Sequence, residues 1–414
     1  MRQFEPVKAV GSLLIAVALL MLGNGFVGTL LSIRLEAAGV SAPFIALLTT
    51  AYFAGLTAGS FRMGGLVARV GHIRAFGAVV SLLSASTLTY AIFPHLVLWI
   101  VLRFVDGLCI AGVYLCIESW LNRRATVETR GTILAAYMIA LYSGQAAGQF
   151  FVNLEGSPML PFVVSSVLVS LAVIPVALTR IASPDIEAQS HIALPALFRA
   201  SPLGLVGVGA TGLALGAFYG LAAVAGRQSG LAIGNITFFI SAVIAGGVAL
   251  QYPMGHLSDR FDRRLVILVA TVGGALAAVA LALAGAVVWA MALAGALLGG
   301  MVFALYPLCV AHTNDRLTEE EQLSASGGLI LVYSAGAAAG PIAGSLAMQM
   351  IGPAGLYLFI AGVIGAAMVF AIWRIFRSEA VPNDQQQPYQ ILPRTSPMSA
   401  ALEPFSEESE FIEE

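Results

Sequence analysis

Charge is the scarcest property of this sequence. Only 10% of its 414 residues are Asp, Glu, Lys or Arg, while 59% are hydrophobic. A typical soluble domain has about 25% charged residues. A chain with so few polar side chains cannot cover a globular surface in water. The shortage excludes an ordinary soluble protein and predicts a molecule whose outer surface faces lipid.

The sequence also has few cysteines, little net charge and no nucleotide-binding motif. The three cysteines lie inside apolar runs, so neither a disulfide framework nor a zinc site is expected. The net charge of −2 makes nucleic acid an unexpected partner. No G-x-x-x-x-G-K-[ST] loop is present, so ATP is not the expected energy source. No hydrolytic constellation stands out either, and we expect no enzyme, no cofactor and no metal site.

Long apolar runs dominate what remains. A helix needs about 20 apolar residues to cross a hydrocarbon core of about 30 Å. The sequence offers twelve such runs, at 9–33, 42–61, 75–93, 97–119, 131–151, 160–179, 203–225, 235–254, 265–286, 288–311, 324–350 and 354–376. The runs are continuous and do not alternate as strands would. Small residues such as Gly55 and Gly59 recur at helical spacing, which lets membrane helices approach closely. We predict an all-α integral membrane protein.

Basic residues predict the orientation of the chain. If both termini are cytoplasmic, the inner loops and ends hold seventeen Lys and Arg residues, and the outer loops hold only Arg34 and Arg227. This bias matches the positive-inside rule. The segment from 379 to 414 contains early Pro and Gln and an acidic end, so we expect a disordered cytosolic tail.

Two parts of the sequence resemble each other. Gly64-Gly-Leu-Val-Ala-Arg-Val-Gly71 is similar to Gly255-His-Leu-Ser-Asp-Arg-Phe-Asp262, 191 positions later. The repeat predicts six-helix halves at 1–180 and 202–378, in parallel orientation, joined by a cytosolic linker at 181–201. Twelve helices in two parallel halves are typical of transporters that bind solute between the halves near the membrane midplane.

Two motifs carry a resemblance to a known family. The loop Gly255–Arg264 is similar to the G-x-L-x-D-R-x-G-R-R signature of the major facilitator superfamily, and Arg103-Phe-Val-Asp-Gly107 resembles its R-x-x-x-G motif. Glu118–Asn122 and Tyr306–Asp315 resemble the YcaD-like bacterial branch. The resemblance covers residues 1 to about 378. It implies the major facilitator fold, a monomer in the lipid bilayer of the bacterial inner membrane, and small-molecule transport.

The loop motif also departs from the family pattern. Ala68 stands where the first copy should have aspartate, Ile73 replaces a basic residue, and Asp262 replaces glycine in the second copy. In the superfamily this loop is linked to conformational switching. Without the aspartate, the N-terminal copy is not expected to form the usual charge contact between the halves, and Asp259 would carry that role alone. Alternatively, the arginines only set the topology. The predicted gating residues are Glu118, Asp259, Arg260, Arg263, Arg264 and Asp315.

Arg103 and Asp106 place two charges within an apolar run. At i and i+3 on a helix they lie within reach of each other. Charges within membrane spans usually face the bundle interior and mark solute or proton routes. Asp106 would carry a proton, or Arg103 would hold an anionic solute; the alternative is a static salt bridge that locks the helix to a neighbour.

Uncharged polar residues in other spans predict the lining of a central cavity. For each one alone, a hydrogen bond between helices is the alternative explanation. The candidates are Asn24, Thr29, Tyr52, Tyr137, Gln145, Gln149, Tyr219, Tyr306 and Tyr333. Their aromatic character suits a small organic solute better than a bare ion.

These observations predict a secondary active transporter that moves a small organic solute by alternating access and is coupled to protons. One alternative is uptake or exchange of an organic anion centred on Arg103. Another is a membrane sensor that uses the same fold without transport. The direction of transport stays open, although Gly148 is followed by Gln149 where drug exporters carry a Gly-Pro pair.

Overall fold

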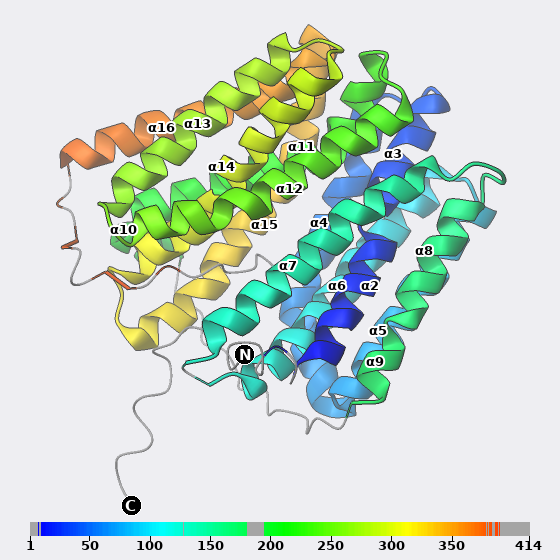
Figure 1. Cartoon of the computed structure of the whole chain (residues 1–414), viewed down its shortest axis with the longest axis horizontal. Helices are drawn as coiled ribbons and strands as arrows, with labels where there is room; N and C mark the ends of the chain where they lie inside the picture. The colour runs from blue at the N-terminus through cyan, green and yellow to red at the C-terminus, as the bar shows by residue number, and fades with distance from the viewer. Residues whose placement is uncertain are drawn as a thin grey trace, which may run out of the picture.

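A computed structural model describes residues 7, 10–126, 128–179, 194–377, 379, 381–382, 386–387 and 389. All regular elements of these residues are helices (Figure 1). They are α2 (Gly11–Asn24), α3 (Val27–Ala37), α4 (Ala42–Val70), α5 (His72–Ile92), α6 (Leu96–Arg124), α7 (Arg130–Gly148), the 3-10 helix η2 (Gln149–Asn153), α8 (Leu160–Leu171), α9 (Val173–Ala177), α10 (Leu194–Ala200), α11 (Pro202–Gln228), α12 (Ile233–Ser258), α13 (Arg263–Leu283), α14 (Val288–Asn314), α15 (Glu319–Ile351) and α16 (Ala354–Arg377).

The prediction of an all-helical membrane protein agrees with this architecture. Among the described residues, eleven helical stretches are long and apolar enough to cross a membrane. Helix α7, which covers the predicted fifth span, is not one of the eleven. The count of twelve spans therefore stays a prediction.

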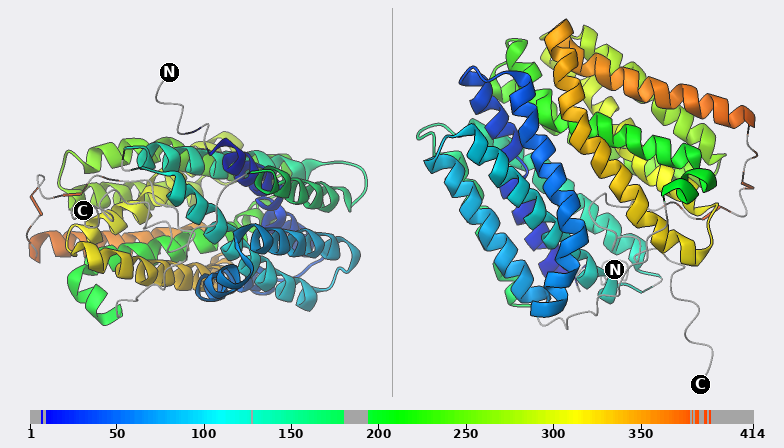
Figure 2. Two further views of the ribbon diagram at one scale, coloured as in Figure 1. Left: turned by 90° about the horizontal axis from the view of Figure 1, so that it is seen from below. Right: turned by 180° about the vertical axis from the view of Figure 1, so that it is seen from behind.

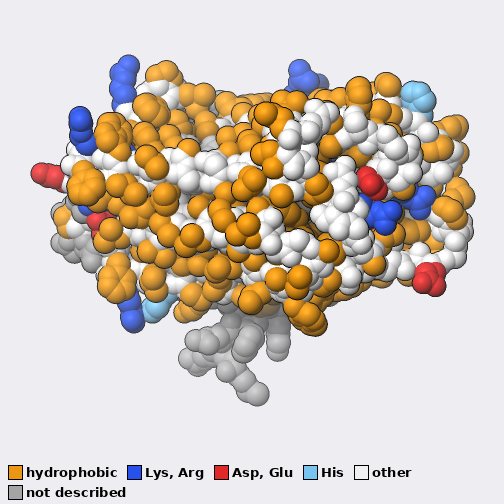
Figure 3. Space-filling view, turned by 90° about the horizontal axis from the view of Figure 1, so that it is seen from above, with side chains coloured by type: hydrophobic (Ala, Val, Ile, Leu, Met, Phe, Trp, Pro, Cys, Tyr) orange, Lys and Arg blue, Asp and Glu red, His pale blue; other side chains and the backbone are white. Residues whose placement is uncertain are grey.

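Hydrophobic side chains cover much of the molecular surface. Leu293 is 77% exposed and Phe376 is 85% exposed. Figure 3 shows one face, on which hydrophobic side chains dominate and the few charged ones lie toward the margins. Such a surface is suited to contact with acyl chains.

The helices form two groups with matching internal contacts. Helices α2–α9 lie on one side of the molecule, and α10–α16 lie on the other (Figures 1 and 2). In the first group α2 packs against α7 and α4 packs against α6; in the second, α11 packs against α15 and α12 against α14. These pairs correspond in the predicted repeat. The two groups meet mainly where α4 contacts α15, α3 contacts α11 and α7 contacts α12.

Glycine sets the close approach of α4 and α6. A Cβ atom at Gly55 would lie 1.9 Å from the carbonyl oxygen of Phe104, and one at Gly107 would lie 1.9 Å from that of Tyr52. No side chain fits at such distances, because real Cβ contacts begin near van der Waals separation. This contact brings Tyr52 on α4 beside Arg103 on α6.

The first predicted span is interrupted. Helix α2 ends at Asn24 and α3 begins at Val27, so Gly25 and Phe26 separate two helices. A Cβ at Gly25 would lie 2.5 Å from the carbonyl oxygen of Met21 and 2.9 Å from Cα of Gln145. Gly23 and Gly25, which flank Asn24, favour such an interruption because glycine is a poor helix former. The interruption places Asn24 at a helix end, next to α7.

Polar contacts between the two groups lie toward one end of the molecule. We call the end where α4 and α6 finish and α7 and α13 begin the basic end, because it carries Arg69, Arg124 and Arg264. Toward the opposite end, side chains of one group bond to the other. These contacts are Ser32 to the oxygen of Gly220 (3.5 Å), Thr50 to that of Ala338 (2.7 Å), Ser241 to that of Ala146 (2.9 Å), Asn153 to Thr237 (2.9 Å) and Arg227 to Glu36 (3.3 Å).

Candidate functional site

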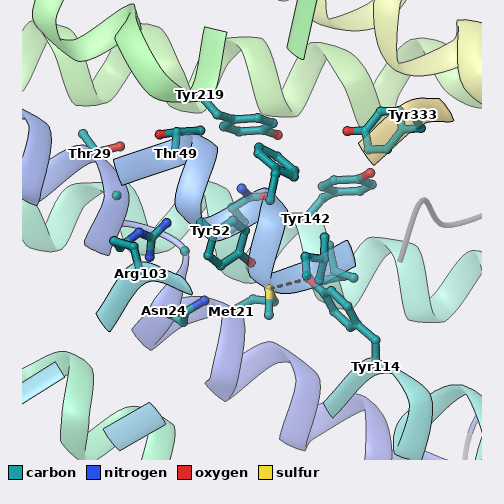
Figure 4. A pocket seen from close by; sticks show the side chains of 16 residues that line it. Met21, Asn24, Thr29, Thr49, Tyr52, Arg103, Tyr114, Tyr142, Tyr219 and Tyr333 are labelled. Atoms are coloured by element: carbon teal, nitrogen blue, oxygen red, sulfur yellow. Dashed lines mark hydrogen bonds between the residues drawn. The ribbon is translucent and has the colours of Figure 1, made fainter. Parts of the chain in front are cut away.

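A cavity of about 150 Å³ lies between the two groups of helices. Side chains from both groups line it (Figure 4). The lining comprises Met21, Asn24, Gly25, Gly28, Thr29, Thr49, Tyr52, Phe53, Leu56, Arg103, Tyr114, Leu141, Tyr142, Gln145, Tyr219 and Tyr333. A cavity needs only about 10–15 Å³ of such volume to hold one water molecule, so this space is much larger than a single-water site. It suits a small solute.

Arg103 is the one charged side chain among the described residues that line this cavity. Its guanidinium carbon lies 4.3 Å from the centroid of the Tyr52 ring, in cation–π contact. Its Nη1 lies 3.5 Å from Oδ2 of Asp106, and its Nε is buried without a hydrogen-bond partner. Charge-assisted hydrogen bonds are usually about 2.7–2.9 Å long, so this ion pair is loose. Arg103 therefore keeps donors available for a ligand.

Asp106 lies behind Arg103 and outside the cavity lining. It is 1% exposed, and its Oδ2 accepts a 2.6 Å hydrogen bond from the hydroxyl of Tyr90 on α5. Its Oδ1 is buried without a hydrogen-bond partner. A buried carboxylate with one unsatisfied oxygen is costly, so Asp106 depends on Arg103 and Tyr90.

The cavity has an aromatic end. Tyr114, Tyr142, Tyr219 and Tyr333 come from α6, α7, α11 and α15. In Figure 4, Tyr114, Tyr142 and Tyr333 lie on the side away from Arg103 and Asn24, and Tyr219 lies nearer the middle. The Tyr114 hydroxyl donates to Sδ of Met21 at 3.7 Å. Both groups of helices thus contribute rings to one wall.

Seven predicted residues meet around this cavity, and four others named with them do not. Asn24, Thr29, Tyr52, Arg103, Gln145, Tyr219 and Tyr333 line it. Gln149 instead donates from Nε2 to the oxygen of Gly25 at 2.8 Å, and Tyr137 donates to Oε1 of Glu118 at 3.0 Å. Tyr306 lies behind the wall, 5.4 Å from Tyr333 between ring centroids. Tyr137, Gln149 and Tyr306 make contacts between helices and are not among the lining residues, and neither is Asp106, which lies behind Arg103.

Three polar lining residues were missed: Thr49, Tyr114 and Tyr142. Each shares a helix face with a predicted residue. Thr49 precedes Tyr52 by three positions and Tyr142 precedes Gln145 by three, while Tyr114 follows Arg103 by eleven, which is about three helical turns. Extending each candidate along its own helix face would have found them.

Charged residues cluster at the basic end of the second group. Nη1 of Arg263 lies 2.6 Å from Oδ2 of Asp315, and Nη2 lies 3.7 Å from Oδ1 of Asp259. Burial raises the pKa of Asp315 above its usual value, although Arg263 acts in the opposite direction. These predicted gating residues contact one another within the second group of helices.

Asp262 caps the start of α13. Its side chain accepts from the backbone N–H of Arg264 at 3.0 Å and from Nη2 of Arg264 at 2.7 Å. Burial alone would raise the pKa of Asp262, but the hydrogen bonds and charge of Arg264 lower it below its usual value. The departure from glycine at this position therefore provides a helix cap.

The remaining gating candidates lie at the same end. Glu118 is fully buried on α6 and accepts the hydrogen bond from Tyr137 on α7 described above. Arg260 is exposed after the end of α12. Glu118 thus joins two helices of the first group, and its predicted gating role stays a prediction.

The part of the chain that the structure describes contains no group of three or more His, Cys, Asp or Glu side chains placed to hold a metal ion. Cys109, Cys116 and Cys309 are free and buried. The chemistry available in the cavity is therefore that of a cation, amides, hydroxyls and aromatic rings.

Proteins of a membrane transporter family are similar to this chain in sequence. A sequence model of the Major Facilitator Superfamily matches residues 204–401. The chain is 28% identical over 376 residues to the MFS-type transporter YcaD of Salmonella enteritidis PT4, covering 90% of this chain and 96% of that protein. It is 28% identical over 388 residues to YcaD of Salmonella arizonae, covering 92% and 97% respectively.

Solved structures share the fold. The nucleoside transporter NupG superposes with a TM-score of 0.72 at 13% sequence identity, covering 90% of this chain and 99% of that chain. A bacterial homologue of the human lysosomal transporter Spinster, in an inward-facing and occupied conformation, gives a TM-score of 0.73 at 13% identity, covering 92% and 98%. At this identity the likeness concerns the fold alone.

Proposed function

We propose that this chain, which is similar to transporters of the Major Facilitator Superfamily and of its YcaD branch, moves a small organic anion across the membrane by alternating access. Arg103 would hold the negative group of the solute. One observation carries the proposal: the cavity between the two groups of helices has a single charged lining residue among those described, and that residue is an arginine.

The position of Arg103 supports binding over a purely structural role. A structural arginine would be expected to satisfy its donors within the protein. Here the ion pair to Asp106 is 3.5 Å long and Nε has no partner. A carboxylate entering the cavity would supply the missing acceptors, in the bidentate geometry that guanidinium favours.

The contacts between the groups support alternating access. They join the groups toward the opposite end, while a second cavity, of about 260 Å³, lies between α7 and α12 at the basic end. We propose that the two groups rock as the two predicted halves, with the basic end and both termini in the cytoplasm of a bacterial inner membrane. Under this proposal the arrangement is a state open to the cytoplasm.

Proton coupling through Asp106 is the second candidate. The observation that favours it is the buried Oδ1 without a hydrogen-bond partner. Protonation of that oxygen would remove the buried charge when a solute anion draws Arg103 away. Asp106 would then exchange a proton once per cycle.

Transport into proteoliposomes tests both proposals. Purified protein would be supplied with radiolabelled lactate, succinate or benzoate, with and without an imposed pH gradient. We expect uptake of at least one acid, and we expect Arg103→Lys to weaken it because the planar fork is lost. Equal uptake by the variant would overturn the role of Arg103. Full gradient-driven uptake by Asp106→Asn would overturn the role of Asp106 as proton carrier.

A further inference from the structure

The two ends of the central cavity differ in chemistry. Arg103, Asn24 and Thr29 lie at one end, Tyr114, Tyr142 and Tyr333 lie at the other, and Tyr219 lies on the wall between them (Figure 4). A solute that fills the space would therefore place its charge and its apolar part at opposite ends.

A second layer of aromatic rings holds the tyrosines in place. The ring of Phe303 on α14 lies 5.4 Å from that of Tyr142 and 6.5 Å from that of Tyr219, between centroids. Phe218 lies 5.6 Å from Tyr219, and Tyr306 lies 5.4 Å from Tyr333. Rings at these separations prefer edge-on or offset partners. The wall is a preformed aromatic cage and not a flexible aliphatic surface.

We propose that the transported solute is a small aromatic acid, whose ring occupies this cage while its carboxylate contacts Arg103. The proposal rests on the proposed function and adds the chemistry of the solute's apolar part. Tyr114 and Tyr142 belong to the first group of helices and Tyr219 and Tyr333 to the second. A ring between them contacts both groups, so its binding favours their approach.

Equilibrium binding to the purified full chain in detergent tests this class with three probes. Benzoate has both ring and charge, cyclohexanecarboxylate has the charge without aromaticity, and benzamide has the ring without charge. Each ring contact strengthens binding by about two- to tenfold beyond burial, so benzoate, in contact with several rings, should bind about tenfold more tightly than cyclohexanecarboxylate. Benzamide should bind more weakly than benzoate by at least as much.

Variants locate the effect. Tyr219→Leu should weaken benzoate binding by about tenfold and leave cyclohexanecarboxylate unchanged, while Tyr219→Phe should stay within about twofold of wild type. Tyr357→Leu, a buried tyrosine outside the cavity lining, is the matched control. Rescue by phenylalanine separates ring contact from a lost hydroxyl.

The outcomes separate the two proposals. Equal affinity for the two acids would overturn the aromatic cage and leave the anion proposal standing. Equal affinity for benzamide and benzoate would overturn the role of Arg103 and leave the cage standing. Absence of binding for all three at millimolar concentration would overturn both.

A different surface carries a second inference. Part of the predicted tail contacts the charged cluster at the basic end. The N–H of Gln387 donates to Oδ1 of Asp315 at 3.0 Å, and its oxygen accepts from Nη2 of Arg263 at 2.7 Å. The N–H of Tyr389 donates to Oδ1 of Asp259 at 2.7 Å. All three contacts use the main chain of the tail.

The ring of Tyr389 lies against α12, at the cavity between α7 and α12. A Cβ atom at Gly255 would approach Cδ1 of Tyr389 to 2.2 Å, so only glycine at this position leaves room for the ring. The ring also lines the cavity of about 260 Å³ whose other walls are α7, at Leu134, and α12, at His256. If the basic end closes, α7 and α12 approach, and Tyr389 must leave.

The geometry points to a docking surface formed by Gly255, Asp259, Arg263 and Asp315. Its occupant is this chain's own tail, and the docked tail holds the basic end open. Spin labels at exposed positions Thr132 of α7 and Leu257 of α12, both changed to cysteine, report the distance across that end. The native cysteines are buried and should not react.

Three tail variants test the docking surface. Gln387→Pro removes the N–H that Asp315 accepts, and Tyr389→Ala removes the ring. Both should shift the label distances toward a shorter population. Gln387→Ala keeps the main-chain contacts and should match wild type. Unchanged distances in the first two variants, or an equal shift in Gln387→Ala, would overturn the inference.

Discussion

Removing the charge of Arg103 should destabilise the protein far more than removing the whole ion pair. Arg103→Gln leaves Asp106 as a buried carboxylate, 1% exposed, with Tyr90 as its remaining donor. Breaking a buried pair by removing one partner typically costs 3–5 kcal/mol. Because the pair is loose at 3.5 Å, we expect the low end of that range, about 3 kcal/mol.

The double variant Arg103→Gln, Asp106→Asn removes both charges, so the buried unpaired carboxylate no longer exists. Replacing both members of a buried pair is often nearly neutral, and we expect a free energy of unfolding within about 1 kcal/mol of wild type. Binding of the acid should stay lost, because the second substitution restores no cation. Stability would thus be rescued without function.

Unfolding in detergent micelles, followed by tryptophan fluorescence, measures the difference. Trp99 and Trp120 are buried on α6, the helix that carries both charges. If the double variant is as unstable as Arg103→Gln, the loss comes from the contact of Arg103 with Tyr52 and not from an unpaired carboxylate. If neither variant is destabilised, the pair is hydrated and Asp106 does not depend on Arg103.

Three further changes have expected outcomes. Gly107→Leu should lower the free energy of unfolding by about 2 kcal/mol or more, since a Cβ at position 107 would lie 1.9 Å from the carbonyl oxygen of Tyr52. An unchanged thermal midpoint would contradict the close packing of α4 and α6. Asp262 has a folded-state pKa below its usual value, so its stabilisation is present above the unfolded-state pKa and is lost as the pH falls through the lower folded-state pKa. The difference in thermal midpoint between wild type and Asp262→Asn should therefore be largest near neutral pH and vanish in strong acid. A difference that does not change with pH would contradict the stabilising role of the Asp262 carboxylate. Glu36→Gln removes the partly exposed ion pair with Arg227 at the opposite end. The population of molecules that are open at that end should rise by about twofold in label-distance measurements. A smaller open population in the variant would exclude a closing role for the ion pair.

The fold followed from the composition and the length of the apolar runs. Eleven of the predicted spans coincide with helices long and apolar enough to cross a membrane. The fifth fell short because α7 combines Tyr137, Tyr142 and Gln145 with small residues. The polar residues that made this helix a cavity candidate also reduce its apolar character.

The site could be predicted only in part, because sequence spacing fixes a helix face but not the partner of a polar group. Arg103 and Asp106 lie on one face, yet one lines the cavity and the other points to Tyr90 on α5. Tyr137 meets Glu118 and Gln149 meets Gly25, and neither contact can be read from periodicity. The glycine contacts that bring α4 to α6 decide these partners.

Chemical labelling of one cysteine from the two sides of the membrane shows whether the cavity opens to each side. Asn24→Cys lines the cavity beside Arg103 (Figure 4), and the native cysteines are buried. A membrane-impermeant maleimide would be applied to oriented proteoliposomes from each side in turn. Alternating access predicts labelling from both sides, because the cavity opens to each in turn. Labelling from one side only, or from neither, would contradict it.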